Sequence, residues 1–62
     1  MYVLLYTETN EYLEKVIYKP FIKYFTTTNL SDAMQFVFME DAKNYLVKNG
    51  LDDADFAIYE LL

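Results

Sequence analysis

The chain of 62 residues contains no cysteine, no histidine and no arginine, and it has one glycine and one proline. Without cysteine and histidine it lacks a thiolate nucleophile, the commonest general base and the commonest zinc ligands. Without arginine it lacks bidentate phosphate clamps, and one glycine cannot build a phosphate-binding loop. These absences exclude most enzyme classes, so we expect a protein that is not an enzyme and holds no cofactor.

The remaining candidates for chemistry are one hydroxyl and a group of carboxylates. Ser31 is the only serine, and it falls in the predicted first turn of a helix with no base available to activate it. The densest acidic cluster is Asp52, Asp53 and Asp55, which lacks the glycine and the distal glutamate of an EF-hand loop. We therefore predict neither a catalytic residue nor a metal site.

The length and the spread of apolar residues predict one compact domain over residues 1–62. Chains of about 60 residues bury only about 60% of their unfolded surface, so they need very good packing or self-association. Apolar residues make up 55% of the chain, and no run of them is long enough to span a membrane. The first residues, MYVLLYTETNEY, lack the basic start and the cleavage site of a secretory signal. We expect a cytoplasmic protein with no membrane partner.

The charges are distributed unevenly. Residues 1–31 hold three acids and three lysines, whereas residues 32–62 hold seven acids and two lysines, so the net charge of −5 lies in the second half. Direct binding to nucleic acid is disfavoured, because phosphate contacts require a basic stripe. The acidic half either keeps a small apolar protein in solution or steers it to a basic surface of a partner.

Apolar and aromatic runs predict four strands, over residues 2–7, 12–18, 21–27 and 55–61. Thr9, Asn10 and Glu11 supply a turn between the first two strands, and Lys19-Pro20 interrupts the chain before the third. The first three strands form a meander. The last is expected beside the first, either parallel to it through a right-handed crossover or at an edge.

Helix signals bracket residues 30–49. Asn29 is a candidate N-cap with Asp32 three residues later, and Gly50 stands at the expected C′ position after Lys48.

The stretch FVFM at residues 36–39 conflicts with a single helix, because its four side chains would point in directions about 100° apart and only one stripe can be buried. We favour a short helix over residues 30–35, an extended link over 36–38 and a second helix over 39–49, with either Phe36 or Phe38 plugging the core. Ala42, Tyr45 and Leu46 would face the sheet. One long helix with its spare aromatics against a dimer partner is the alternative.

The predicted fold class is α+β, a sheet of about four strands in the order β-β-β-α-α-β with one helical layer on one face. Six of the seven tyrosines fall in predicted strands and give both sheet faces an aromatic character, and a single helical layer covers only one of these faces. The other face tolerates water, dimerises or binds a partner. The candidate partner-binding residues come from this face, the FVFM stretch and the acidic half: Tyr6, Tyr12, Tyr24, Phe36, Phe38, Asp52, Asp53 and Asp55.

The run TTTNLSDAMQF followed by MEDAKNYLVKNG, after YLEKVIY and before DFAIYELL, resembles small proteins encoded by phages and mobile elements of AT-rich bacteria. The resemblance spans most of the chain and carries no catalytic residues. It implies an accessory protein that binds and alters a host protein. Some proteins of this kind inhibit restriction, CRISPR or other defence systems, and some are acidic mimics of nucleic acid. A net charge of −5 without regular spacing departs from such mimics.

Two hypotheses follow from the sequence. In the first, the chain is a non-enzymatic accessory protein that binds and modulates a host protein in the host cytoplasm, as a defence-system inhibitor would. In the second, it is a structural or self-assembling subunit that forms a homodimer or larger homo-oligomer.

Overall fold

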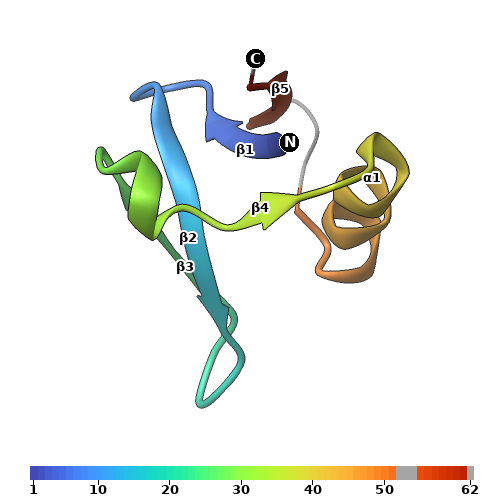
Figure 1. Ribbon diagram of the computed structural model, residues 1–62. Helices are drawn as coiled ribbons and strands as arrows, with labels where there is room; N and C mark the ends of the chain where they lie inside the picture. Colours follow the sequence, from blue (N-terminus) through green and yellow to red (C-terminus); the bar gives the residue numbers. More distant parts are fainter. Residues whose placement is uncertain (52–54, 62) are drawn as a thin grey trace.

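The structure of the protein is a computed structural model, which describes residues 1–51 and 55–61. Within these residues it is an α+β fold in which a five-stranded antiparallel sheet carries one α-helix (Figure 1), so the predicted fold class is confirmed. The elements, in chain order, are β1 (Tyr2–Tyr6), β2 (Glu11–Ile17), β3 (Lys23–Thr27), the 3-10 helix η1 (Leu30–Asp32), β4 (Gln35–Phe36), α1 (Met39–Lys48) and β5 (Phe56–Glu60).

Strand β1 is the centre of the sheet. Strand β5 pairs with it along its full length on one edge, from Tyr2 to Tyr6. The other edge is shared, because β4 pairs at Tyr2 and Val3 and β2 pairs at Leu5 and Tyr6. Strand β3 continues the sheet beyond β2, which confirms the predicted meander. The last strand lies beside the first as expected, but it runs antiparallel, so the parallel crossover is wrong.

The two hairpins of the meander differ in shape. In the β1–β2 turn, Asn10 adopts a left-handed conformation with φ of 61°, and its amide donates to the Tyr6 carbonyl at 2.7 Å. Asparagine tolerates this conformation better than most residues. The pairing of β2 with β3 shifts between Leu13 and Lys15. This bulge changes which residues face inward, so that Leu13 and then Val16 pack against the core.

The segment that follows β3 corrects the predicted first helix. A helix over residues 30–35 was expected, but only η1, a single turn, forms. Asn29 caps it as predicted, since its Oδ1 accepts a bond from the Ser31 amide at 3.1 Å. The chain then extends as β4, because backbone pairing with β1 is available to Gln35 and Phe36. The extended link is confirmed, and one long helix over 30–49 is wrong.

Helix α1 runs from Met39 to Lys48, and the predicted glycine, Gly50, follows its C-cap residue. Gly50 has φ of 65°, a conformation that costs glycine little. Its amide donates to the Val47 carbonyl at 3.2 Å, and the Leu51 amide donates to the Leu46 carbonyl at 2.9 Å. These two bonds form a Schellman motif, which satisfies carbonyl groups at the helix end and turns the chain towards β5.

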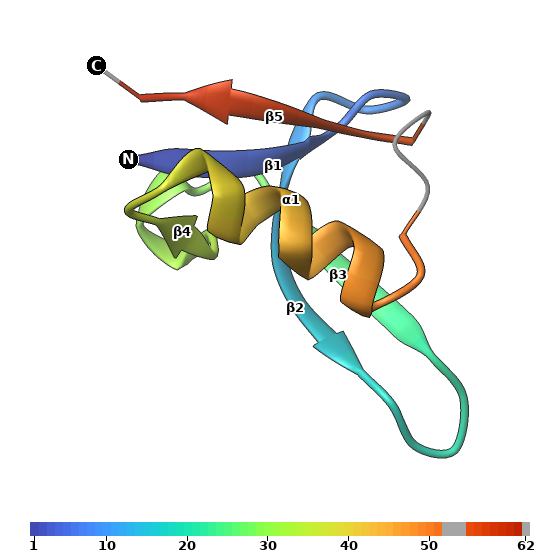
Figure 2. The ribbon, with the colours of Figure 1, turned by 90° about the vertical axis from the view of Figure 1, so that its right-hand side faces the viewer.

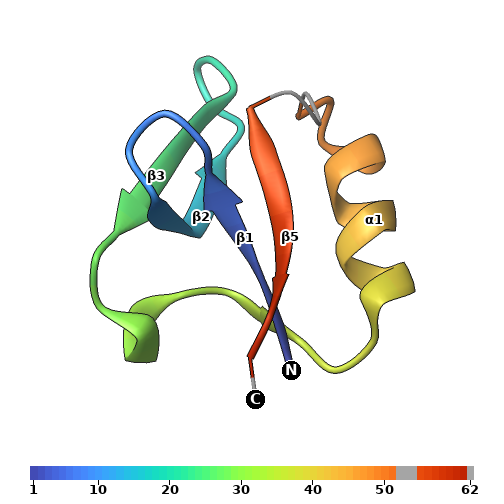
Figure 3. The same ribbon diagram turned by 90° about the horizontal axis from the view of Figure 1, so that it is seen from above.

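The core lies between α1 and the sheet. Its largest buried side chains are Leu4, Leu13 and Phe56, and α1 contributes Ala42 and Leu46, as predicted. Val3 points to the opposite face, since side chains alternate along a strand, yet it is also fully buried. The segment that contains η1 lies on that side of the sheet, across from α1 (Figures 1 and 3). The second face is therefore closed at Val3, whereas Leu5 and Tyr12 on the same face are only partly buried.

Candidate functional site

The long β2–β3 hairpin projects from the body of the protein (Figures 1 and 2). Its end carries exposed apolar side chains. We call residues 17–23 the hairpin tip. Tyr18, Phe21 and Ile22 are exposed to 55%, 78% and 64%. A third strand was predicted over residues 21–27, but pairing ends where Ile17 meets Lys23. Phe21 and Ile22 therefore belong to the connecting loop, and their side chains have no sheet to pack on.

The same hairpin concentrates positive charge. Lys15 and Lys23 place their Nζ atoms 5.2 and 5.3 Å from the centre of the Phe25 ring, on the face turned away from α1. These distances correspond to cation–π contacts. With Lys19 in the loop, three lysines and exposed apolar groups share one end of a protein whose net charge is −5.

A polar contact fixes the hairpin to the end of α1. The Tyr18 hydroxyl donates to Oδ1 of Asn49, and the amide nitrogen of the Asn49 side chain donates to the Tyr45 carbonyl at 2.8 Å. Asn49 is buried, which makes these bonds energetically important because an unpaired buried amide is costly. The tip is thus held in a defined orientation relative to the helix.

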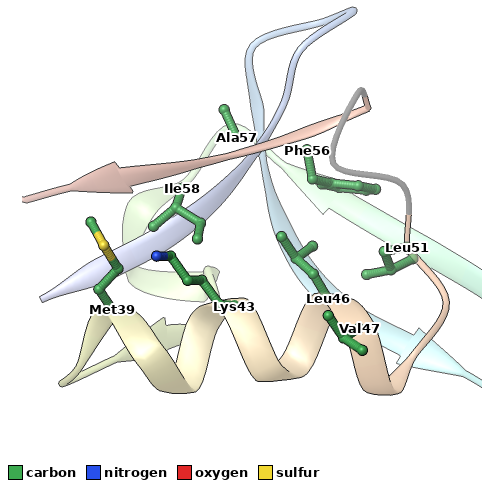
Figure 4. A pocket seen from close by; sticks show the side chains of 8 residues that line it. All are labelled: Met39, Lys43, Leu46, Val47, Leu51, Phe56, Ala57 and Ile58. Atoms are coloured by element: carbon green, nitrogen blue, oxygen red, sulfur yellow. The ribbon is translucent and has the colours of Figure 1, made fainter.

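A groove of about 710 Å³ lies between α1 and β5 (Figure 4). The described residues that line it are Met39, Lys43, Leu46, Val47, Leu51, Phe56, Ala57 and Ile58. Among them only Lys43 is charged, and Val47 is 80% exposed. The edge of β5 that faces away from β1 pairs with no strand in residues 1–51 and 55–61. We call it the open edge of β5.

An aromatic cluster joins the hairpin to β5 beneath the groove. The rings of Tyr6, Tyr24 and Phe56 are 5.1 to 5.7 Å apart. The Tyr6 hydroxyl donates to Oε2 of Glu8 at 2.6 Å. This bond, with further contributions from the Tyr24 hydroxyl and from burial, raises the pKa of Tyr6 well above its ordinary value. Burial, together with the neighbouring Tyr18, also raises the pKa of Tyr45.

The predicted partner-binding tyrosines do not share one surface. Tyr6 and Tyr24 belong to the aromatic cluster on the face that α1 covers. Tyr12 is half-buried on the other face, where it pairs with Leu5.

The other predicted residues are also dispersed. Phe36 packs against Tyr45, with ring centres 5.5 Å apart, whereas Phe38 is 66% exposed, so one aromatic plugs the core as expected. Asp55 is exposed, and Asp52 and Asp53 lie outside the described residues.

Sequence reasoning missed both surfaces that the structure brings out. The hairpin tip had a usable signal, because the proline before Phe21 and Ile22 removes a backbone donor and favours a loop over a strand. The groove had none, since it depends on the distance between α1 and β5.

In the described part of the chain, no helix has the length and apolar character that crossing a membrane requires. The same residues contain no group of three or more His, Cys, Asp or Glu placed to hold a metal ion. Comparisons with protein-family models, with curated proteins and with solved structures gave no match to this chain.

Proposed function

We propose that this chain is a small, non-enzymatic accessory protein that binds and modulates a protein of its host cell, and that the hairpin tip is its contact surface. The observation that carries the proposal is the exposure of Tyr18, Phe21 and Ile22 at the end of a projecting hairpin. Large apolar and aromatic side chains of this kind supply most of the binding energy at protein interfaces when they enter a pocket.

The charges around the tip indicate what the partner surface offers. Lys15, Lys19 and Lys23 surround the apolar residues, so a complementary surface combines an apolar pocket with an acidic rim. The Tyr18 contact with Asn49 reduces the entropy lost on binding, because it already fixes the orientation of the hairpin tip. The resemblance to phage and mobile-element proteins makes a host protein, such as a component of a defence system, the expected partner.

The absence of catalytic machinery in the sequence supports the non-enzymatic part of the proposal. With no histidine, cysteine or arginine in the chain, the groups that most often act as bases, nucleophiles and phosphate clamps are missing. The described residues contain no group of three or more acids placed to hold a metal ion, and no described carboxylate lines the groove between α1 and β5.

The test is affinity capture from a bacterial host lysate, followed by binding measurements with the purified protein that is recovered. The double variant Phe21→Ser/Ile22→Ser is compared with Phe38→Ser, which removes an aromatic residue of similar exposure from the other end of α1. We expect the double variant to weaken binding by at least about tenfold and Phe38→Ser to have little effect. Binding should also weaken at moderate salt, because the lysine contacts are screened.

Two results would overturn the proposal. One is capture of a defined partner that the double variant binds as well as the original protein does. The other is recovery of the bait alone under every salt condition.

A further inference from the structure

The backbone groups on the open edge of β5 can be assigned from two hydrogen bonds that flank the strand. The Thr7 amide donates to the Asp55 carbonyl at 2.8 Å, and the Leu61 amide donates to the Met1 carbonyl at 2.7 Å. Both bonds continue the antiparallel register of β1 with β5. In such a pair, hydrogen-bonded positions recur at every second residue. The odd-numbered residues of β5 therefore bond to β1.

The even-numbered residues consequently direct their backbone N–H and C=O groups to the open edge. These residues are Phe56, Ile58 and Glu60, and their side chains lie on the face that α1 covers. Sheet edges of soluble proteins are usually protected by lysine, proline or a bulge, because unpaired edges invite another strand. The sequence of β5, FAIYE, has none of these protections and only one charge.

A stripe of exposed side chains on α1 runs alongside this edge. Met39, Lys43 and Val47 are spaced four residues apart, line the groove and are exposed to solvent. Figure 4 shows the Lys43 side chain extending from α1 towards Ile58 across the groove. Figure 3 looks onto β5 with α1 to one side of it, so the helix does not cover the open edge.

We propose that the occupant of this edge is a second copy of the chain, paired antiparallel through β5 about a two-fold axis at Ile58. This register places Ile58 opposite Ile58 and Phe56 opposite Glu60 of the second copy. All of these positions direct their backbone groups outward, so each pair exchanges two hydrogen bonds. The two sheets become one, and the two grooves face each other above the joined strands.

Charge complementarity favours a second copy over an unrelated strand. In this register, Glu60 of the second copy lies beside Phe56, on the face from which Lys43 points into the groove. By symmetry, each dimer contains this pair of opposite charges twice. Self-association is a common way for domains of this size to gain stability.

The first measurement is the mass in solution by sedimentation equilibrium, over about 1 to 300 µM, the range in which a small interface associates. We expect a concentration-dependent increase from the monomer mass of 7.4 kDa towards twice that value. Glu60→Pro removes a backbone donor from the open edge and none from the β1 pairing, so it should weaken association at least about tenfold.

The decisive test mixes two single variants. Lys43→Glu alone places an acid opposite Glu60, and Glu60→Lys alone places a lysine opposite Lys43, so each variant should associate about tenfold more weakly than the original chain. In an equimolar mixture, one copy of each variant restores opposite charges at both contacts. We expect heterodimers to recover the original affinity. An ion pair within one chain could not be restored by mixing, so recovery identifies the contact as intermolecular.

The proposal is overturned if the chain stays monomeric over the whole concentration range. It is also overturned if the chain dimerises with an affinity that neither Glu60→Pro nor mixing of the charge variants changes. Phe21→Ser/Ile22→Ser should leave the dimer intact, which separates this result from the test of the hairpin tip.

Discussion

The two outer strands, β3 and β5, are the same length but expose different chemistry at their edges. Strand β3 begins with Lys23, and the Nζ atoms of Lys15 and Lys23 lie over its Phe25 ring. Strand β5 has no lysine and lies beside an apolar groove. Lysine at an edge opposes pairing with another chain, because pairing would desolvate the charge. The difference indicates that β3 stays in water whereas β5 is available to another strand.

The two strands also differ in how deeply their phenylalanine side chains are buried. Phe56 of β5 is 2% exposed and belongs to the core, whereas Phe25 of β3 is half-buried under two lysines. Of these two strands, β5 therefore contributes more to the core. Pairing of β5 with a second copy would protect a strand that the core cannot lose.

The largest loss of stability is expected from truncating Phe56, and truncating Phe25 serves as the comparison. Phe56→Ala should lower the free energy of unfolding by about 3–5 kcal/mol, because it leaves a cavity between α1 and the sheet. Domains of this size have about 3–9 kcal/mol of total stability, so this loss is a large fraction of the total. Phe25→Ala should cost only about 1 kcal/mol. Urea unfolding followed by circular dichroism measures both, and equal losses would contradict the assignment of the core to the β5 side.

A smaller effect is expected at the contact that fixes the hairpin. Asn49→Ala removes the acceptor of the Tyr18 hydroxyl and the donor to the Tyr45 carbonyl, and it should lower the free energy of unfolding by about 1–3 kcal/mol. Asn44→Ala is the matched control, because Asn44 is exposed on the same helix and its loss should cost less than about 0.5 kcal/mol. Similar losses for the two variants in thermal unfolding would show that the buried contact contributes nothing.

The sequence predicted those elements whose signals are local. The helix predicted over 39–49, which forms over Met39–Lys48, followed from acids in its first turn, Lys48 in its last and Gly50 beyond it. Strands β1 and β2 followed from apolar runs around a turn. Competition between elements was harder to predict. Residues 33–36 have enough apolar character for a helix, but pairing of β4 with β1 captures them, and a two-residue strand leaves no periodic signal.

The candidate site was predicted less well than the fold, because surfaces depend on how elements are arranged. The tyrosines of the predicted strands suggested an aromatic sheet face that no helix covers. The bulge near Glu14 changes which residues of β2 face inward, and Tyr6 and Tyr24 pack in the aromatic cluster on the side of α1. The groove requires α1 and β5 to lie at a particular distance. Among the aromatic residues that were predicted to bind a partner, Phe38 is the most exposed, at 66%.

A single methyl group added at Gly50, just after α1, should lower the stability of the protein. Gly50→Ala should lower the free energy of unfolding by about 1 kcal/mol, because alanine is disfavoured at a φ of 65°. A β-carbon at this position would meet no described atom within 4 Å, so the cost is conformational rather than steric. Gly50→Asn should cost less, since asparagine tolerates this region. An alanine variant as stable as the original chain would contradict the Schellman assignment.

The weakest effect is expected at alkaline pH, at the residue that touches both outer strands. Tyr6 contacts Tyr24 of β3 and Phe56 of β5, and its bond to Glu8 raises its pKa above the ordinary value near 10. Above about pH 10 the unfolded chain therefore releases a proton that the folded chain keeps, so the free energy of unfolding falls as pH rises.

Tyr6→Phe should remove this part of the alkaline loss, and Glu8→Gln should reduce it. Stability measured by urea unfolding from about pH 9 to 11 shows the difference, because the contribution is complete below the unfolded pKa. If Tyr6→Phe and the original chain lose stability in parallel over this range, the hydrogen bond to Glu8 does not hold the proton.

The most direct test of the difference between the two edges is amide hydrogen exchange, measured residue by residue by NMR at low and high protein concentration. The open edge of β5 exposes the amides of Phe56, Ile58 and Glu60. We predict that these three exchange rapidly in dilute solution and become protected as concentration rises, whereas the amides of β3 exchange at the same rate in both samples. Protection that grows on β3, or exchange on β5 that does not depend on concentration, would contradict the account.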